Sequence, residues 1–319
     1  TSDAPDLVLG DTNGIEDIFV RDMVTGVTTR VSVSSAGVQT DGPSGRPDIS
    51  ADGNIIVFES EATNLASSPD LNGHKDVYRH DVALGQTTRV SITVSALETN
   101  GNSDNPVISA DGMVIAFRSE ASNLLNGTAD TNGVADVFCT SFIGIQRVSV
   151  SSAGAEGDSW SGQLFGIDIN GDGQQILFAS AATNLVAGDT NTWPDMFVRD
   201  QMTGTTERVS LTVTGAEGDK SCRSGTISDD GDVIAFDSAS TNMVPGDTNN
   251  FPDCFVLVRS TGALARISVA EDGTEGTSYS IMPFVSADGS VICFQSLAPE
   301  LDGGPVGAAG NVLDTFRYH

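Results

Sequence analysis

Short apolar runs recur along the chain, and clusters of Gly, Asp, Asn and Ser separate them. The most apolar runs cover residues 55–58, 114–117, 176–178, 233–236 and 291–294, and each ends in Phe. An Asp-Gly pair precedes each of them. Runs of this length between turn residues are typical of β-strands. The pattern therefore predicts an all-β chain.

Three further strand types accompany each apolar run. A first strand lies before the Asp-Gly pair, a third strand has the pattern D-x-F/Y, and a fourth contains R-V/I-S. The arginine of the fourth strand recurs at intervals of 59, 58, 61 and 58 residues, at Arg30, Arg89, Arg147, Arg208 and Arg266. A fixed period made of short strands indicates a repeat fold.

Repeated units of four antiparallel strands favour a single β-propeller over residues 1–319, built from repeats of about 59 residues. First, second and fourth strands occur five times, and third strands occur six times, as residues 17–19, 76–78, 136–138, 195–197, 253–255 and 314–316. We expect five blades. Six blades with incomplete ends is the alternative.

The repeat resembles that of TolB-type propellers. The shared elements are S-x-D-G, an apolar strand ending in F-x-S, D-x-F/Y-x-x-D and T-G-x-T-x-R-V-S. The resemblance implies tight hairpin turns at the Asp-Gly pairs. It also implies a periplasmic, secreted or cell-surface location, because such propellers abound there in bacteria.

Strand order places the long connections on one side of each blade. The loops from second to third strand and from fourth strand to the next first strand leave on the same side. Each is about a dozen residues long, against a usual median of about 4 to 6. Long loops on a rigid scaffold commonly carry function. We call this side the long-loop face.

One motif on this face, D-x-N-x-x-x-D, occurs five times. Carboxylate and amide oxygens near a turn are ligands that calcium accepts. Asp and Asn in such a spacing also form hydrogen-bonded turns with their own backbone, so the sequence leaves both interpretations open. The copies are Asp11, Asn13, Asp17; Asp70, Asn72, Asp76; Asp130, Asn132, Asp136; Asp189, Asn191, Asp195; and Asp247, Asn249, Asp253.

Large side chains also gather in these loops. Exposed aromatic residues can stack on a sugar ring or anchor a protein interface, or they can fold back over the ends of the strands. The candidate ligand-binding residues are Trp160, Trp193, Arg223, Phe251 and Tyr279.

The net charge of the chain argues against some classes of function. The 43 acidic residues outnumber the 15 Lys and Arg, for a net charge of −28. Such a surface repels phosphate backbones and anionic lipids, which argues against nucleic-acid binding and membrane insertion. No apolar run approaches the length of a membrane span. The four cysteines have no metal-site spacing, and we expect free, mostly buried thiols rather than a disulfide framework.

No catalytic motif is present among the few histidines (His74, His80 and His319) or the Gly-rich turns. Asp48 and Asp168 on first strands are candidate carboxylates for a glycosidase-like or lyase-like enzyme. The repeated arginines are expected to pair with neighbouring aspartates. A sequon at 126–128 is a candidate glycosylation site.

The sequence thus predicts a non-catalytic interaction module that binds a protein partner or a glycan through its long-loop face, with calcium as a candidate ion. A carbohydrate-active enzyme and a structural subunit of a larger assembly are the alternatives.

Overall fold

The computed structural model describes residues 1–68, 70–125, 130–141, 144–163, 165–302 and 314–318. The described part contains 21 strands and one short 3-10 helix, Pro299–Asp302. The chain divides into two compact units, Thr1–Arg147 and Val148–His319, which are described separately below. All strand pairs within the sheets are antiparallel.

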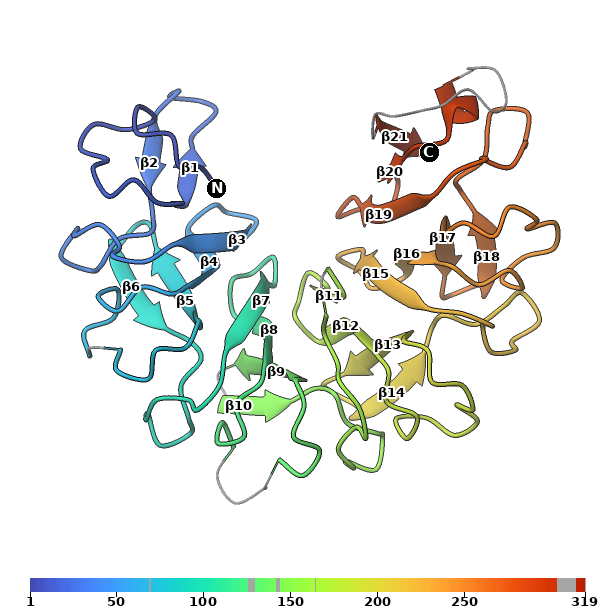
Figure 1. Cartoon of the computed structure of the whole chain (residues 1–319), viewed down its shortest axis with the longest axis horizontal. Coiled ribbons are helices and arrows are strands. Elements are labelled where there is room, and N and C mark those ends of the chain that lie inside the picture. The colour runs from blue at the N-terminus through green and yellow to red at the C-terminus, as the bar shows by residue number, and fades with distance from the viewer. Residues whose placement is uncertain (69, 126–129, 142–143, 164, 303–313, 319) are drawn as a thin grey trace. The chain divides into compact units, whose positions relative to one another are not determined.

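Three sheets make up the unit Thr1–Arg147 (Figure 1). The first has two strands, β1 (Phe19–Arg21) and β2 (Thr28–Arg30). The second contains β3 (Ser44–Ile49), β4 (Ile55–Ser60), β5 (Asp76–Asp81) and β6 (Gln86–Arg89). The third contains β7 (Ser103–Ile108), β8 (Ile115–Ser119), β9 (Asp136–Ser141) and β10 (Gly144–Arg147).

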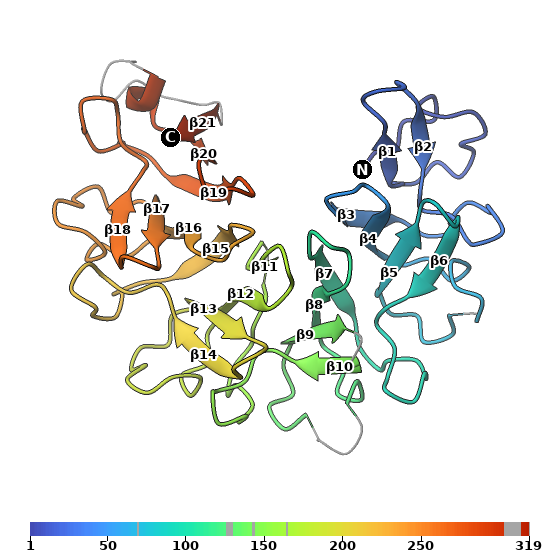
Figure 2. The ribbon, with the colours of Figure 1, turned by 180° about the vertical axis from the view of Figure 1, so that it is seen from behind.

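The unit Val148–His319 also has three sheets, which Figure 2 shows from behind. The first contains β11 (Ile167–Ile169), β12 (Gln175–Ser180), β13 (Asp195–Asp200) and β14 (Thr205–Arg208). The next contains β15 (Cys222–Ile227), β16 (Val233–Ser238), β17 (Asp253–Val258) and β18 (Ala263–Arg266). The last has three strands, β19 (Ser280–Val285), β20 (Ile292–Ser296) and β21 (Asp314–Tyr318).

The predicted strand types are confirmed. Each first strand pairs with its second strand, the second with the third and, in the four complete sheets, the third with the fourth. Five first strands and six third strands are present in the described chain, as the repeat predicted. Five blades therefore begin with their own first strand, and the two-stranded sheet β1–β2 precedes them. The expectation of one continuous propeller over residues 1–319 stays a prediction.

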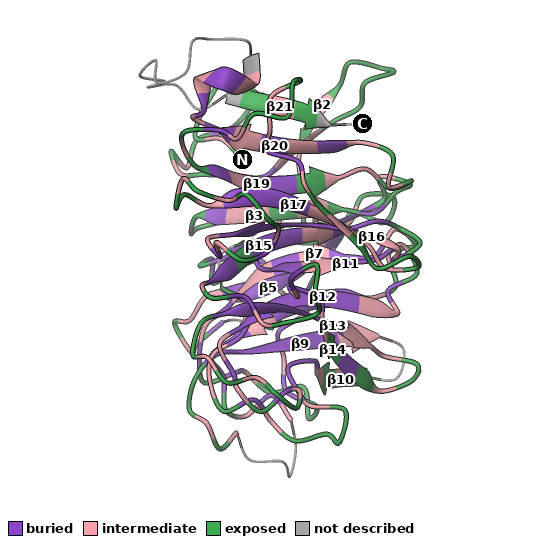
Figure 3. Ribbon diagram, turned by 90° about the vertical axis from the view of Figure 1, so that its right-hand side faces the viewer, coloured by how far each residue is buried: buried purple, intermediate pink, exposed green. Residues whose placement is uncertain are grey.

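The hydrophobic core lies between successive sheets within each unit. The second strands β4, β12 and β16 are buried along nearly their whole length, as Figure 3 shows for β12. Val57 of β4 and Phe117 of the next sheet belong to one buried apolar cluster, and Leu177 of β12 and Phe236 of β16 belong to another. A strand that is covered on both faces must be apolar at consecutive positions, which explains why the second strands do not alternate.

The recurrent Phe of the second strand stacks on the aromatic residue of the third strand. Phe178 lies opposite Phe197 with ring centroids 5.7 Å apart, and Phe236 lies opposite Phe255 at 5.8 Å. Cross-strand aromatic pairs stabilise a sheet beyond the area that they bury. The same pairing explains the coupled F-x-S and D-x-F/Y patterns of the repeat.

The Asp-Gly pairs form the tight hairpin turns that the repeat predicted. Gly53, Gly173 and Gly231 have φ of 73°, 72° and 75°, which only glycine adopts without strain. In the copy at 228–231, the Ser228 hydroxyl donates a hydrogen bond to Asp230 at 2.6 Å. The turns are therefore structural and lie opposite the long-loop face.

Candidate functional site

The long-loop face is built from two loops of each blade that are tied to each other. One loop carries the motif D-x-N-x-x-x-D and leads into the third strand. The other follows the fourth strand and leads to the next first strand. An arginine at the end of the fourth strand contacts carboxylates of both loops, as Arg89, Arg208 and Arg266 do.

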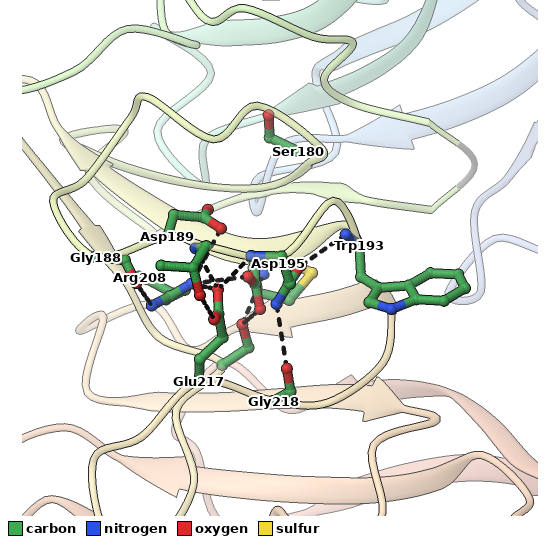
Figure 4. A network of polar contacts seen from close by, with 12 residues as sticks. Ser180, Gly188, Asp189, Trp193, Asp195, Arg208, Glu217 and Gly218 are labelled. Carbon is green, nitrogen blue, oxygen red and sulfur yellow. Dashed lines mark hydrogen bonds and ion pairs between the residues drawn. The ribbon is translucent and has the colours of Figure 1, made fainter.

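Arg208 is the centre of this network in the first sheet of the unit Val148–His319 (Figure 4). Its Nη1 lies 2.9 Å from Glu217, 3.1 Å from Asp195 and 3.5 Å from Asp189. The Ser210 hydroxyl donates to the second oxygen of Asp195 at 2.6 Å. The arginine therefore lies among three carboxylates from both loops.

The following sheet repeats the arrangement around Arg266. Its Nη1 lies 2.6 Å from Glu275, 3.2 Å from Asp253 and 4.0 Å from Asp247. Its Nη2 also donates to the carbonyl oxygen of Gly246 at 3.3 Å. The network is thus a property of the repeat and not of one blade.

The unit Thr1–Arg147 contains the same network around Arg89, and Arg30 and Arg147 contact the aspartates of the motif. Arg89 contacts Asp76 at 3.2 Å, Glu98 at 3.4 Å and Asp70 at 3.9 Å. Arg30 contacts Asp11 at 3.1 Å and Asp17 at 3.4 Å, and Arg147 contacts Asp136 at 3.3 Å. The predicted pairing of the repeated arginines with aspartates is what the structure shows.

The asparagine of the motif forms a turn and a bridge. Its side-chain oxygen accepts a hydrogen bond from the amide two residues later, as between Asn191 and Trp193 at 2.6 Å. Its side-chain nitrogen donates to the other loop, as from Asn249 to the carbonyl oxygen of Gly276 at 2.7 Å. The side-chain oxygens of these asparagines therefore form turn hydrogen bonds, which supports the turn interpretation of the motif.

The glutamates of this network were not among the site residues predicted from the sequence. Glu98, Glu217 and Glu275 each follow the landmark arginine by nine residues, and Gln39 occupies that place in the first copy. Thr190 donates to Glu217 through its hydroxyl (2.7 Å) and its amide (3.0 Å). The constant spacing of nine residues between arginine and glutamate is the sequence feature that could have identified these glutamates.

Burial and the neighbouring groups shift the pKa values of the carboxylates in these networks. Burial raises the pKa of Asp189 to about 7, with further contributions from Glu217 and Asp195. Burial likewise raises the pKa of Asp247 to about 6. Burial acts in the same direction on Glu217, but hydrogen bonds from Thr190 and Arg208 outweigh it and lower the pKa to about 2.

Oxygen atoms of the acidic groups lie close enough to share a cation. In the sets Asp189–Asp195–Glu217 and Asp247–Asp253–Glu275, one oxygen from each residue lies within 4.8 Å of the other two. Such ligands suit calcium. The guanidinium group already lies among them, so a metal ion would compete with the arginine, and calcium stays a prediction.

The predicted aromatic residues lie on the long-loop side of the unit Val148–His319. Trp193, Phe251 and Tyr279 are 48%, 41% and 37% exposed, whereas Trp160 is half-buried. Trp193 points away from the arginine network (Figure 4). It occupies the position in its loop that Phe251 occupies in the next blade. Arg223 is not in one of these loops but at the start of β15, where its side chain is exposed.

The remaining candidate residues have structural contacts. Asp48 accepts the amide of Ile108 at 2.8 Å, and Asp168 accepts the amide of Ile227 at 2.8 Å, so each ties its first strand to that of the next sheet. His80 is buried against Thr87. The four cysteines are free thiols, three buried and one half-buried, as expected. The sequon at 126–128 and His319 lie outside the described residues.

No model of a known protein family and no curated protein matches the sequence. Solved structures do match it. The putative TolB from Agrobacterium tumefaciens has a TM-score of 0.52 at 16% identity over 94% of this chain and 88% of that chain. The β-propeller domain of the Trilobed protease from Pyrococcus furiosus has a TM-score of 0.51 at 13% identity over 87% and 69%.

An oligogalacturonate lyase in complex with manganese gives a TM-score of 0.52 at 16% identity, over 88% of this chain and 68% of that chain. The chain spans less than two thirds of several other matched structures. These comparisons confirm a TolB-type β-propeller fold, and identities this low carry the fold alone. None of the described segments is a helix of the length and hydropathy that a bilayer crossing requires.

Removing the arginine of one network should destabilise the fold. Arg208→Gln leaves Asp189, Asp195 and Glu217 without their cation, and breaking a buried ion pair in this way costs about 3 kcal/mol. We expect urea unfolding to show a loss of this size in the free energy of unfolding. Arg21→Gln, at an exposed arginine, is the control and should change it by about 0.5 kcal/mol at most. Equal stability of the two variants would contradict the structural role of Arg208.

The raised pKa of Asp189 predicts a pH dependence of stability. A carboxyl group with a higher pKa in the folded than in the unfolded chain binds protons more tightly when folded. Its contribution is complete below pH 3.8, the ordinary value, and is lost as pH rises through about 7. We expect the melting temperature to fall between pH 5 and pH 8.

Asp189→Asn should make that decrease smaller, because the titrating group is gone. Asp172→Asn removes one charge from an exposed Asp-Gly turn and is the matched control. Melting curves of the three proteins across this range measure the effect. An unchanged slope in Asp189→Asn would show that another group titrates.

Proposed function

We propose that this protein is a non-catalytic interaction module, an acidic β-propeller whose long-loop face binds a protein partner. The observation that carries the proposal is the exposure of Trp193 and Phe251 in loops held by the arginine networks. An aromatic side chain on a fixed loop loses little conformational entropy on binding, which is why such residues dominate interface energetics. A glycan is the second class of ligand that the same rings suit.

The charge of the chain limits the partner. A net charge of −28 favours a partner with a basic rim around an apolar centre and raises the rate of encounter with it. We place the protein outside the cytoplasm, as a periplasmic, secreted or surface module, on the resemblance of its repeat. A subunit role in a larger assembly is a special case of the same interaction.

The two carboxylates on which the catalytic alternative depends make structural contacts. Asp48 and Asp168 both accept main-chain amides of the neighbouring sheet. These contacts support a structural role for both carboxylates. The match to an oligogalacturonate lyase concerns the fold, so product analysis is included in the test below.

Calcium enters the proposal as a weak ligand that competes with arginine. The side chain of Asp247 is 1% exposed, and neither carboxylate oxygen has a hydrogen-bond donor among the described residues. A divalent cation that displaced Arg266 would give these oxygens a partner and would hold the two loops together in its place.

The binding role is tested with the aromatic residues. Immobilised wild-type protein, a Trp193→Ala/Phe251→Ala variant and Met202→Ala are compared for retention of proteins from an envelope fraction and of an oligosaccharide panel. Met202 is exposed in a short turn on the opposite face and is the matched control. We expect the double variant to retain its ligand about 30-fold less well, as loss of an interface hot spot does.

Retention by Met202→Ala and the melting temperature of the double variant should match those of the wild type. Equal retention by all three proteins would contradict a binding role for these loops. Oligosaccharide products of lower mass would contradict the non-catalytic assignment.

Calcium binding is tested by melting curves with a chelator and then with calcium at about 5 mM, above the dissociation constants typical of extracellular calcium sites. We expect calcium to raise the melting temperature of the wild type and to raise that of Asp247→Asn less, since a bound ligand stabilises the folded state and this variant lacks one of the acidic sets. A wild-type melting temperature that moves in neither condition would remove calcium from the proposal.

A further inference from the structure

A cavity of about 440 Å³ lies among three sheets of the unit Val148–His319. It is at the long-loop end of the inner strands, where β15 begins and β16 ends. Its wall combines apolar side chains with one basic and one acidic residue. The lining residues that matter here are Phe165, Arg223, Asp237, Pro252, Ile281 and Met282.

The acidic residue of the wall is fully occupied by neutral donors. Asp237 accepts the Ser224 hydroxyl, the Ser224 amide at 3.3 Å, the Arg223 amide at 3.4 Å and the Met282 amide at 3.2 Å. Burial raises the pKa of this carboxyl. Asp237 therefore serves to hold the start of β15 against β19, and its oxygens need no cation.

One sheet of the other unit has an ion pair at the equivalent position. Asp237 is the middle residue of the F-x-S pattern, where β8 has Arg118. Arg118 pairs across the strands with Asp104 at 2.8 Å. In β15 and β16 the two charges are exchanged, with Arg223 in the place of Asp104, and no ion pair forms between Arg223 and Asp237.

Arg223 is consequently a cation without a counter-charge. Its side chain is exposed, and among the described residues no carboxylate lies within ion-pair distance of it. Most other arginines of the described chain form ion pairs or hydrogen bonds through their side chains. In a protein of net charge −28, an unpaired guanidinium at the edge of an apolar cavity is a local site for an anion.

The apolar side chains of the wall determine which kind of group can accompany the anion in the cavity. Phe165 is 44% exposed, and Ile281 and Met282 are half-buried. Pro252 and Ala239 add further apolar surface. A cavity with this lining favours a body of aromatic or aliphatic groups over a sugar, whose hydroxyls would lose their hydrogen bonds to water.

We propose that this cavity binds an organic carboxylate with an apolar body, with Arg223 pairing with the carboxylate and Phe165, Ile281 and Met282 contacting the body. The proposal rests on the proposed role of the long-loop face as a binding surface and names a ligand chemistry for one part of it. A free carboxylic acid and the C-terminal carboxylate of a peptide with an apolar last residue share that chemistry.

Calorimetric titration with pairs of probes tests the carboxylate. The probes are 3-phenylpropionate and 3-phenylpropionamide, and a pentapeptide ending in Phe with a free or an amidated C-terminus. We expect each acid to bind at least about tenfold more tightly than its amide, because a charged hydrogen bond is lost. Tighter binding of the free peptide identifies a chain terminus as the source, and tighter binding of the small acid identifies a metabolite.

Two variants assign the binding to Arg223. Arg223→Gln should lose at least about tenfold in affinity for the acid, whereas Lys220→Gln, which removes the same charge three residues earlier, should bind like the wild type. Equal affinity of acid and amide, or acid binding unchanged in Arg223→Gln, would overturn the proposal. The comparison of acid with amide needs no variant to fold.

The result of the acid-binding test can be distinguished from the result of the partner-retention test of the proposed function. The Trp193→Ala/Phe251→Ala variant retains the cavity, so it should bind 3-phenylpropionate like the wild type even where it loses its partner. Failure of every acid to bind the wild type, with partner retention intact, would overturn the carboxylate site and leave the interaction module standing.

Discussion

The pairing of one arginine with the carboxylates of two loops is the constraint on which the long-loop face depends. Loops of this length cost conformational entropy to order. Arg208 and Arg266 link the loops because each guanidinium contacts an Asp of one loop and the Glu of the other. The aromatic side chains above them are thereby held in place before any ligand arrives.

This arrangement costs electrostatic energy. Each network in the unit Val148–His319 sets three carboxylates against one guanidinium, so negative charge remains in a place that is largely buried. Burial is the main cause of the raised pKa of Asp189, and the neighbouring Glu217 and Asp195 raise it further. Replacement of buried ion pairs by apolar residues is often neutral or stabilising. We infer that the networks persist because they define one loop geometry, which apolar contacts among these polar loops would not do.

The sequence was sufficient for the fold because the signals were local. The Asp-Gly turns, the Phe that ends each second strand and the D-x-F/Y pattern each determine a contact within a few residues or across one strand pair. The site was harder to read. Glu217 belongs to a different loop from Asp189, and only the fold brings them together. The role of Arg223 depends on the absence of an ion pair with Asp237. A sequence pattern can suggest which charges pair, but it gives little indication that two neighbouring charges do not pair.

The exchange of charges between the two units shows how a repeat can acquire a binding site without a change of fold. Gly45, Asp104, Arg223 and Ile281 occupy the same place next to a β-bulge. The residue that follows has a positive φ at Arg46, Asn105 and Met282, but Ser224 is not in that conformation. At β15 the bulge therefore presents the Ser224 hydroxyl to Asp237 and satisfies it without a cation. Because the carboxylate is satisfied locally, the neighbouring arginine is released from the scaffold, and one blade differs in chemistry from the others while keeping their backbone pairing.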